Sequence, residues 1–375
     1  MKIAVNTRFL LKDKMEGIGW FTYEILRRLV KQHPTDEFIF FFDRPYHPNF
    51  IFGDNVTPLV VSPPARHPVL WYIWFEISVK RILNKWRPDV FLSPDGYCVL
   101  QNDVPTVLVM HDIAHIHYAQ QVPYLVGKYY EYFVPKFLAT ADRIVTVSEY
   151  TKQDIIHQYR IPESKISAAC NGCRSIFEPL TEQEKRRIRQ KYTVGEDYFF
   201  YIGAQHPRKN VARLITAFDI FKKRTNAPTK LLLGGRLAWQ TAAIKTAYEQ
   251  AANKRDVIQL GYVADRELPN VLGAATALTY VSLFEGFGVP ILEAMHCEVP
   301  VITSNVSSMP EVAGEAAVLV NPTSVESIAD GMECLYINKK LQRQLIRSGK
   351  QQRQLFTWEK AAAIVYKNIK SAANQ

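Results

Sequence analysis

The length, composition and charge of the chain favour a two-domain globular protein and exclude several other classes. Of its 375 residues, 47% are hydrophobic, 17 are glycine and 5 are cysteine, and the formal net charge is +10. This length suffices for two buried cores, and so few cysteines fit a reducing cytoplasm. No charged-then-apolar leader precedes the first apolar segment, and no apolar run reaches the roughly 20 residues that span a bilayer. We therefore expect a cytoplasmic protein without a secretion signal or a transmembrane helix.

Strands and helices are predicted to alternate along both halves of the chain, which favours parallel sheets joined by crossover helices. In chain order the predicted strands are 2–5, 38–42, 90–92, 106–110, 144–147, 199–202, 230–233, 257–260, 277–281 and 299–303. The predicted helices are 20–32, 126–140, 151–159, 213–224, 242–252, 268–274, 290–297 and 324–338. An Asn-Gly turn and Pro179 precede a charged helix that Thr181 opens, so a domain boundary is predicted near Pro179.

The stretch L-F-E-G-F-G-V-P-I-L-E at 283–293 predicts a site for a phosphorylated sugar ligand. It follows a predicted buried strand, and Gly286 and Gly288 allow a turn whose backbone can approach a ligand closely. The proline suits the first position of a helix, and a helix N-terminus attracts anions through its unpaired N–H groups and its dipole. Glu285 and Glu293 flank the turn, and carboxylates accept hydrogen bonds from hydroxyls. A diphosphate on the helix end, a sugar on Glu285 and a ribose on Glu293 together describe a nucleotide-sugar site.

The same stretch and several segments around it resemble the retaining glycosyltransferases of family 4, which have the GT-B fold. Glu285 and Glu293 match the E-x7-E motif of that family within E-G-F-G-V-P-I-L-E-A-M. In the C-terminal half the resemblance continues through F-Y-I-G at 200–203, P-R-K-N at 207–210, G-Y-V at 261–263, S-S-M-P-E-V-A-G at 307–314 and F-T-W-E at 356–359. The N-terminal half matches more loosely, through G-I-G at 17–19, H-D-I at 111–113, V-T-V-S at 145–148 and N-G at 171–172.

The resemblance implies an α/β protein with two Rossmann-like, doubly wound parallel-sheet domains that face each other across a cleft. Residues 1–178 would form the acceptor-side domain, 179–357 the nucleotide-sugar domain, and 358–375 a helix that crosses back to the first domain. The implied reaction moves a hexose, with mannose as the first choice, from GDP-mannose or a UDP-sugar to a hydroxyl acceptor. A saccharide or lipid-linked saccharide in cell-surface polysaccharide or glycolipid assembly is the implied acceptor. Retention of configuration is implied too, without a metal ion or another cofactor.

The resemblance also implies roles for individual residues. Lys209 and Arg208, in a predicted loop, would stabilise the diphosphate leaving group, because negative charge accumulates there as the glycosidic bond breaks. His111, at the end of the strand 106–110, would hydrogen-bond the donor sugar. Ala204 and Trp20 stand where many relatives carry arginine, so charge stabilisation would rest more heavily on Arg208 and Lys209. The implied catalytic set is His111, Arg208, Lys209 and Glu285, and the implied donor-binding set is Gly17, Gly19, Val263, Gly286, Phe287, Gly288, Val289 and Glu293.

Two groups of residues leave metal or redox chemistry as an alternative. His111, Asp112, His115 and His117 offer imidazole and carboxylate groups, which suit zinc or iron, and residues 170–173 form a C-x-x-C pattern. The histidines are loosely spaced on a predicted loop, and no second Cys or His pair accompanies the cysteines at zinc spacing. A sugar contact for His111 and a plain turn at 170–173 are therefore the favoured interpretations.

The distribution of charge and aromatic residues leaves contact with a membrane surface as an alternative. The half after residue 180 carries 26 Lys and Arg against 18 Asp and Glu, with basic runs at 185–191 and 339–353. Such runs are usually solvated helix faces, although positive charge also attracts anionic lipid. No nucleic-acid-binding motif accompanies them, so nucleic acid is not an expected partner. The aromatic stretch at 70–75 fits either a buried helix near the acceptor site, which we favour, or an interfacial helix at the inner membrane face.

Two other functions are compatible with the same donor contacts. A GT-B-fold epimerase and a nucleotide-sugar binding protein without transferase activity would both need a diphosphate site and a carboxylate for the sugar. The joint presence of Glu285, Glu293, Lys209 and His111 favours the transferase. Product formation from a labelled donor distinguishes the three.

Overall fold

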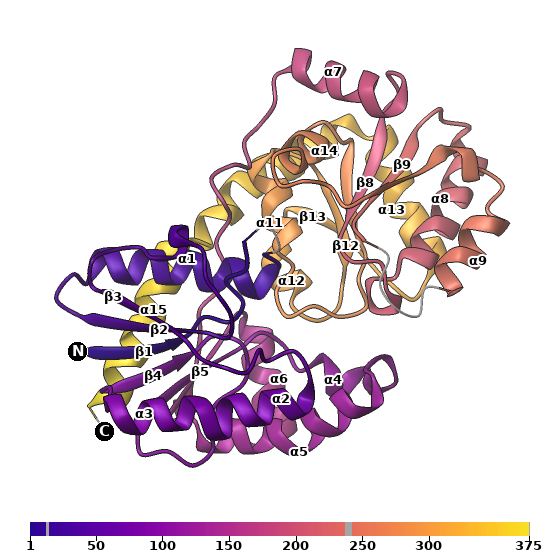
Figure 1. Ribbon diagram of the computed structural model, residues 1–375. Coiled ribbons are helices and arrows are strands. Elements are labelled where there is room, and N and C mark those ends of the chain that lie inside the picture. Colours follow the sequence, from indigo (N-terminus) through magenta and orange to yellow (C-terminus); the bar gives the residue numbers. More distant parts are fainter. Residues whose placement is uncertain (13–14, 237–241, 375) are drawn as a thin grey trace. The chain divides into compact units, whose positions relative to one another are not determined.

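The chain forms two compact α/β units, which Figure 1 shows in a computed structural model. The structure describes residues 1–12, 15–236 and 242–374. Unit 1 comprises Met1–Asn171 together with Thr357–Gln375, and unit 2 comprises Gly172–Phe356. The predicted fold class, α/β with two parallel-sheet domains, is confirmed because each unit contains a single parallel sheet.

Unit 1 is built on a seven-stranded sheet with the order β3-β2-β1-β4-β5-β6-β7. All neighbouring strands run parallel. The order reverses between β1 and β4, and open α/β sheets bind ligands at such a switch point, beyond the carboxyl ends of the strands. The strands are β1 (Lys2–Asn6), β2 (Glu37–Phe42), β3 (Val56–Val60), β4 (Val90–Ser93), β5 (Thr106–Met110), β6 (Arg143–Thr146) and β7 (Ile166–Ala168).

Helices cover both faces of the unit 1 sheet (Figure 1). Helices α1 (Gly17–Gln32) and α15 (Trp358–Ala373) pack against each other, and α15 also contacts strands β4 to β7. The other face packs a hydrophobic core against the remaining helices. These are α2 (Pro68–Ile73), the π-helical segment η2 (Trp74–Val79), α3 (Lys80–Trp86), α4 (Ala114–His117), α5 (Tyr124–Thr140) and α6 (Glu149–Tyr159), with short 3-10 turns at η1 (Pro48–Phe50), η3 (Ala119–Gln121) and η4 (Glu163–Lys165).

The aromatic stretch at 70–75 lies on α2 and η2, and its last two side chains are packed inside unit 1. Trp74 and Phe75 are buried, and the Trp74 indole N–H donates to the carbonyl of Val61 at 2.8 Å. Trp71 packs edge-on against Tyr97, with ring centroids 5.4 Å apart. Trp74 and Phe75 are thus buried in unit 1 while Tyr72 is exposed, and a position of this stretch near the acceptor site stays a prediction.

Unit 2 is built on a six-stranded parallel sheet with the order β10-β9-β8-β11-β12-β13. This order reverses between β8 and β11, so the second switch point lies between those two strands. The strands are β8 (Tyr198–Ile202), β9 (Lys230–Gly234), β10 (Val257–Gly261), β11 (Ala277–Tyr280), β12 (Val301–Ser304) and β13 (Ala317–Val320).

The helices of unit 2 bury the sheet and position the loops at its carboxyl edge. Helix α7 begins with a capping box, in which Thr181 and Glu184 satisfy each other's backbone amides, as expected for the charged helix predicted there. The helices are α7 (Glu182–Thr193), α8 (Val211–Thr225), α9 (Ala242–Gln250), α10 (Leu268–Gly273), α11 (Val289–His296), α12 (Met309–Ala313), α13 (Val325–Ile337) and α14 (Lys339–Gln352), with 3-10 turns at η5 (Pro207–Lys209), η6 (Lys254–Asp256) and η7 (Arg353–Leu355).

Candidate functional site

The switch point of unit 2 brings together three of the residues predicted to act on the donor. Strand β8 leads into the turn η5, which carries Arg208 and Lys209, and strand β11 leads into the loop that carries Glu285. Because β8 and β11 are adjacent and parallel, both loops leave the same edge of the sheet. Residues that lie some 76 positions apart in the sequence therefore meet.

Glu285 is the centre of a buried network of charged and hydroxyl groups. The Lys209 Nζ donates to Glu285 Oε1 at 2.6 Å, and the Tyr280 hydroxyl donates to the same oxygen at 2.7 Å. The Arg208 Nη1 lies 3.5 Å from Glu285 Oε2. Burial would raise the pKa of Glu285, yet Lys209 and Arg208 lower it to about 2. The carboxylate is therefore ionised at every physiological pH.

Serine hydroxyls fix the backbone of the loop that carries Glu285. The Glu285 amide donates to Ser307 Oγ at 3.1 Å. The Ser308 hydroxyl lies 2.9 Å from both the Glu285 carbonyl and the Phe287 carbonyl. These two serines begin the S-S-M-P-E-V-A-G segment, so that segment shapes the loop that carries the E-x7-E motif.

Helix α11 begins at Val289, one residue before the predicted start at the proline. Its N-cap is Gly288, whose backbone is left-handed with a φ of +100°. A Cβ at Gly288 would also lie 3.1 Å from Ile291 Cδ1, which is a tight contact; glycine is favoured here chiefly by its left-handed backbone. The Phe287 ring is buried edge-on against Phe356, with centroids 5.5 Å apart. Its side chain therefore packs in unit 2, which leaves its backbone as the part that can contact a donor.

Glu293 lies one turn into α11 and is paired with an arginine that the sequence did not single out. The Arg174 Nη2 is 3.5 Å from Glu293 Oε1, and its Nη1 donates to Asp265 Oδ1 at 3.1 Å. Glu293 is only 5% exposed. Burial raises the pKa of Glu293 to about 7 although Arg174 lowers it, and the charge of Asp265 adds to the rise. The two glutamates of the E-x7-E motif thus differ sharply in acidity.

Val263 lies in the loop after β10, close to the end of the neighbouring strand. A Cβ placed on Gly234, the last residue of β9, would lie 3.1 Å from Val263 Cγ2. The preceding Tyr262 is exposed. Val263 is therefore at the carboxyl edge of the unit 2 sheet, on the same edge as η5 and the Glu285 loop.

His111 belongs to unit 1, where it directly follows β5. Its Nε2 lies 2.8 Å from the carbonyl of Pro94, and its ring packs edge-on against Phe21 at 5.1 Å. Burial lowers the pKa of His111, so the ring is neutral near pH 7. Because a carbonyl oxygen can only accept, Nε2 carries the proton and Nδ1 is an acceptor. His111 can thus accept a hydrogen bond from a hydroxyl.

Comparison with known families decides what these two units are. The model described as glycosyltransferase family 4 matches residues 15–174, and the model described as glycosyl transferases group 1 matches residues 182–352. The chain belongs to glycosyltransferase family 4. The predicted family is therefore confirmed.

Individual relatives agree with this assignment. The glycosyltransferase is 29% identical over 340 residues to O-antigen chain mannosyltransferase B of Escherichia coli, covering 88% of this chain and 89% of that protein. It is 25% identical over 279 residues to the serotype-specific mannosyltransferase WbdA of Escherichia coli, covering 72% of this chain but 34% of that protein. A crystal structure of Anabaena Alr3699/HepE in complex with UDP and glucose superposes with a TM-score of 0.77 at 15% identity, over 99% of this chain and 100% of that chain. The fold is GT-B.

The structure corrects the prediction for Gly17 and Gly19 in the glycosyltransferase. They were expected in a loop before a helix at Trp20, but α1 already begins at Gly17, so both lie in its first turn. A Cβ at Gly19 would lie 2.7 Å from the carbonyl oxygen of Phe9, whereas Gly17 has open space around it. The backbone at Phe9 passes so close to the first turn of α1 that a side chain at position 19 would collide with it. The predicted location in a loop was therefore wrong, whereas the donor-binding role expected for Gly17 and Gly19 stays a prediction.

The histidines considered as metal ligands each hydrogen-bond to a different residue and do not converge on one point. His115 Nε2 lies 3.1 Å from the Tyr159 hydroxyl, and His117 Nε2 lies 2.8 Å from Asp154 Oδ2. Within the part of the chain that the structure describes, no three His, Cys, Asp or Glu side chains are arranged to hold a metal ion. These histidines are accounted for by their hydrogen bonds to α6.

A second ion pair, which sequence reasoning missed, occupies the switch point of unit 1. Arg8 follows β1 and Asp95 follows β4, and Arg8 Nε lies 2.5 Å from Asp95 Oδ2. The Asn6 amide donates to the same oxygen at 2.7 Å, and the Arg8 guanidinium lies 4.3 Å from the centre of the Tyr97 ring. Neither residue belongs to a recognisable motif, so only the strand order reveals that they meet.

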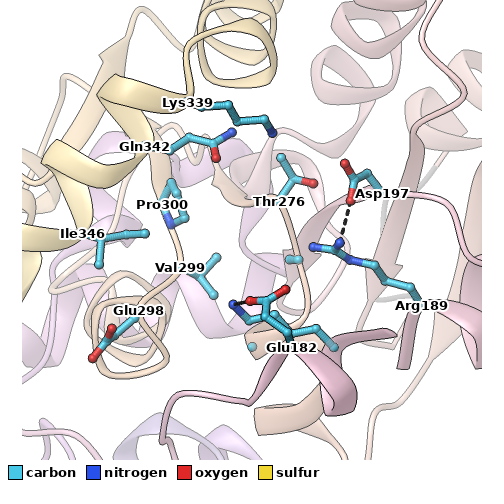
Figure 2. A pocket seen from close by; sticks show the side chains of 13 residues that line it. Glu182, Arg189, Asp197, Thr276, Glu298, Val299, Pro300, Lys339, Gln342 and Ile346 are labelled. Carbon is cyan, nitrogen blue, oxygen red and sulfur yellow. Dashed lines mark hydrogen bonds and ion pairs between the residues drawn. The ribbon is translucent and has the colours of Figure 1, made fainter. Parts of the chain in front are cut away.

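A pocket of about 220 Å³ lies elsewhere in unit 2 (Figure 2). Thr276 and Pro300, which line it, precede β11 and β12, so it opens at the opposite end of the strands from Glu285. Four of its charged side chains form two ion pairs, with Arg189 2.8 Å from Asp197 and Lys185 2.8 Å from Glu182. None of the predicted site residues lines this pocket.

Proposed function

We propose that this glycosyltransferase transfers mannose from GDP-mannose to a hydroxyl of a saccharide or lipid-linked saccharide, with retention of configuration. The single observation that carries the proposal is the Glu285, Lys209 and Arg208 network at the switch point of unit 2. The choice of mannose follows the name of the relative aligned over most of both chains, an O-antigen chain mannosyltransferase. Assembly of a cell-surface polysaccharide or glycolipid is the corresponding role.

The network suits a reaction in which a diphosphate leaves a sugar. Glu285 pairs with Lys209 at 2.6 Å and with Arg208 at 3.5 Å. A bound diphosphate would attract both cations, and Glu285 would then accept hydrogen bonds from sugar hydroxyls. As the C1–O bond breaks, negative charge grows on the diphosphate, and preorganised cations stabilise that charge selectively. The acceptor oxygen bonds to C1 as the bond from C1 to the diphosphate oxygen breaks, and the acceptor's proton passes to the leaving diphosphate.

Helix α11 and the loop after β10 supply further donor contacts in this proposal. Its N-terminus and the preceding loop, Gly286 to Val289, offer backbone amides and the positive end of a dipole to the diphosphate. Glu293, one turn further along, would accept from the ribose hydroxyls. Val263, at the same sheet edge, would contact the nucleoside through the loop after β10.

His111 is proposed to hold the donor sugar in the reacting geometry. Its neutral ring keeps Nε2–H on the Pro94 carbonyl at 2.8 Å, which fixes the ring orientation and leaves Nδ1 as an acceptor. A neutral acceptor of this kind positions a hydroxyl and does not act as a nucleophile or as a strong acid. The prediction made from the resemblance is retained in this form.

Metal-independent catalysis is part of the proposal, since two cations and a helix end already oppose the diphosphate charge. Lys209 and Arg208 both lie within 3.5 Å of the carboxylate at the same switch point. Activity is expected to survive EDTA. Abolition by EDTA with rescue by manganese or zinc contradicts this part of the proposal.

Peripheral contact with an anionic membrane is proposed for exposed side chains of α2 and α5. Five large apolar side chains of these helices are at least 47% exposed: Val69, Tyr72, Tyr124, Leu125 and Tyr132. Tyr72 lies 6.0 Å from Phe133 of α5, which joins the helices, and the Lys136 Nζ lies 3.3 Å from the Tyr132 ring centre. Exposed aromatic groups beside lysines fit an anionic lipid surface. Among the described residues, no helix has the length and hydropathy of a membrane span.

Turnover of a labelled donor tests the enzymatic proposal. GDP-mannose labelled in the sugar is incubated with the purified protein and lipid-linked saccharide acceptors, with UDP-glucose and UDP-galactose in parallel. We expect labelled glycoside with an α-linkage from GDP-mannose and loss of product with Glu285→Gln. Glu182→Gln, an exposed carboxylate on α7 paired with Lys185, is the matched control and is expected to keep full activity.

The same experiment separates the alternatives. An epimerase would return a free nucleotide sugar with inverted hydroxyl configuration, and a binding protein would bind donor without releasing nucleoside diphosphate. Product with inverted anomeric configuration contradicts retention, and product from UDP-sugars alone contradicts the assignment of GDP-mannose. Co-sedimentation with phosphatidylglycerol vesicles, compared with phosphatidylcholine vesicles, tests the membrane face. Equal sedimentation of Tyr124→Ser/Leu125→Ser and the unaltered protein contradicts it.

A further inference from the structure

Arg174 connects two parts of the proposed donor site in unit 2, the loop after β10 and helix α11. It follows the unit boundary by two residues, in a segment with no helix or strand before α7. Its side chain is 10% exposed and lies over the Phe177 ring, 5.1 Å from the centre. One guanidinium nitrogen reaches Asp265, in the loop after β10, and another reaches Glu293 on α11. The guanidinium is therefore held by two carboxylates and by the face of an aromatic ring.

Glu293 needs a cation, because it is buried among groups that oppose its ionisation. The charged and titratable groups around it are Arg174 from the segment before α7, Asp265 from the loop after β10, and the thiols of Cys173 and Cys297. Asp265 repels a second negative charge, and the two thiols are held neutral because burial raises their pKa values. Among these groups Arg174 alone favours the carboxylate form.

We propose that Arg174 is a positioning residue, which keeps Glu293 ionised and turned toward the ribose of the donor while Asp265 anchors the guanidinium. The inference rests on the proposed function, in which Glu293 accepts from the ribose. A carboxylate can accept from two vicinal hydroxyls at once, whereas a protonated carboxyl group has lost one acceptor and gained a donor. The ionised form is thus the competent form for a diol.

In this role Arg174 determines how the affinity for the nucleotide depends on pH, because it lowers the pKa of Glu293. With a pKa of Glu293 of about 7, roughly half of the protein is competent at pH 7. Removal of an adjacent opposite charge typically moves a carboxyl pKa by about 1–3 units. Because the apparent dissociation constant scales inversely with the competent fraction, a rise of one to two units weakens binding at pH 7 by roughly 5- to 50-fold. Raising the pH should restore most of this loss.

Calorimetric titration of the full chain with GDP between pH 6 and pH 9 tests the inference. For the unaltered protein, we expect the affinity to increase with pH around a midpoint near 7. Arg174→Gln should move the midpoint upward by at least one unit, and Arg174→Lys should restore part of the shift. Asp265→Asn should move it downward, because Asp265 raises the pKa of Glu293. The matched control is Arg224→Gln, which removes an exposed arginine that bridges acids of α13, and it should leave the profile unchanged.

The outcomes distinguish this inference from the function on which it rests. If the unaltered protein binds neither GDP nor UDP at any pH, the proposed donor site is wrong. If it binds nucleotide but Arg174→Gln weakens binding equally at pH 6 and pH 9, Arg174 is a structural contact and the positioning role is refuted. If Arg174→Gln does not fold, as judged by its circular dichroism and melting, the profile of Asp265→Asn decides, and an unchanged or upward midpoint in that variant also refutes the role.

Discussion

Replacing Glu293 by glutamine is expected to stabilise the protein at alkaline pH while it removes nucleotide binding. In the folded protein the pKa of Glu293 is about 7, against 4.5 for an ordinary glutamate. As the pH rises, the unfolded chain releases this proton near pH 4.5 but the folded protein keeps it until about pH 7. Between these values the folded state binds more protons than the unfolded state, so the free energy of unfolding falls as the pH rises. Glutamine keeps the size of the side chain and an acceptor for Arg174, but it has no proton to lose. The buried ionisation penalty disappears in the variant.

The size of the effect follows from the difference between the two pKa values. The pKa of about 7 lies well above the ordinary value of 4.5, and at about 1.4 kcal/mol for each pKa unit the penalty relieved above pH 7 is about 3 kcal/mol. For a unit of this size, each kcal/mol shifts the melting temperature by roughly 2–4 °C. The variant should therefore melt roughly 6–12 °C higher at pH 8. Near pH 4.5 both proteins carry a neutral side chain, so the difference should be small.

Differential scanning calorimetry of both proteins at pH 4.5 and pH 8 makes the comparison, with Glu182→Gln as a control on an exposed carboxylate. Titration with GDP at pH 8 checks that the stabilised variant has lost nucleotide affinity. A melting difference of the same size at both pH values would mean that the substitution changes packing and that Glu293 is not a strained carboxylate. A variant that melts lower at pH 8 would refute the reasoning outright.

Three further substitutions test the network at the switch point of unit 2. Lys209→Ala should lower kcat by roughly 10²–10³-fold with a smaller change in the donor KM, because Lys209 opposes charge that develops on the leaving group; steady-state kinetics in which only KM rises would contradict this. Tyr280→Phe should lower the free energy of unfolding of unit 2 by about 2 kcal/mol in urea, because the buried Glu285 loses the hydroxyl that donates to it at 2.7 Å. An unchanged free energy of unfolding would show that water replaces this donor. Asn210→Ala should cost about 2–4 kcal/mol in the same assay, because its amide donates to the carbonyls of Val281 and Pro322 at 2.9 and 2.7 Å; a loss below 1 kcal/mol would contradict the importance of that link.

The strands that could be predicted from the sequence are those with neighbours on both sides, together with β10. Strand β5 was predicted with its observed limits, Thr106–Met110, because a strand covered on both faces is a continuous apolar run. The strands missed were β3, β7 and β13, and each lies at an edge of its sheet. Edge strands are short or carry polar and exposed positions, and β3 even contains a proline. Their apolar pattern is therefore too weak to separate them from loops.

The candidate site could be predicted where its residues belong to a local motif. Glu285, Lys209 and Glu293 lie in segments whose glycine, proline and carboxylate spacing is informative by itself. Tyr280 was missed because it ends a buried strand and has the pattern of a core residue, and its hydroxyl acquires a role only through the bend that brings Glu285 back to it. Arg174 lies 119 positions from Glu293. No local pattern could reveal that contact, which depends on the completed fold.

Unit 1 is made of two separate pieces of the chain, so it cannot finish folding during synthesis until the second piece has left the ribosome. All seven strands of its sheet precede unit 2 in the sequence, while α15, which contacts four of those strands, follows unit 2. Tyr366 of α15 stacks on His33 at 3.4 Å and donates to Asp36, and Asn368 meets the Ser167 hydroxyl at 3.2 Å. During synthesis the face of the unit 1 sheet that α15 later covers remains exposed to solvent until all of unit 2 has been made. Unit 2 is contiguous and can fold first, so the half of the molecule made earlier is the half that finishes later.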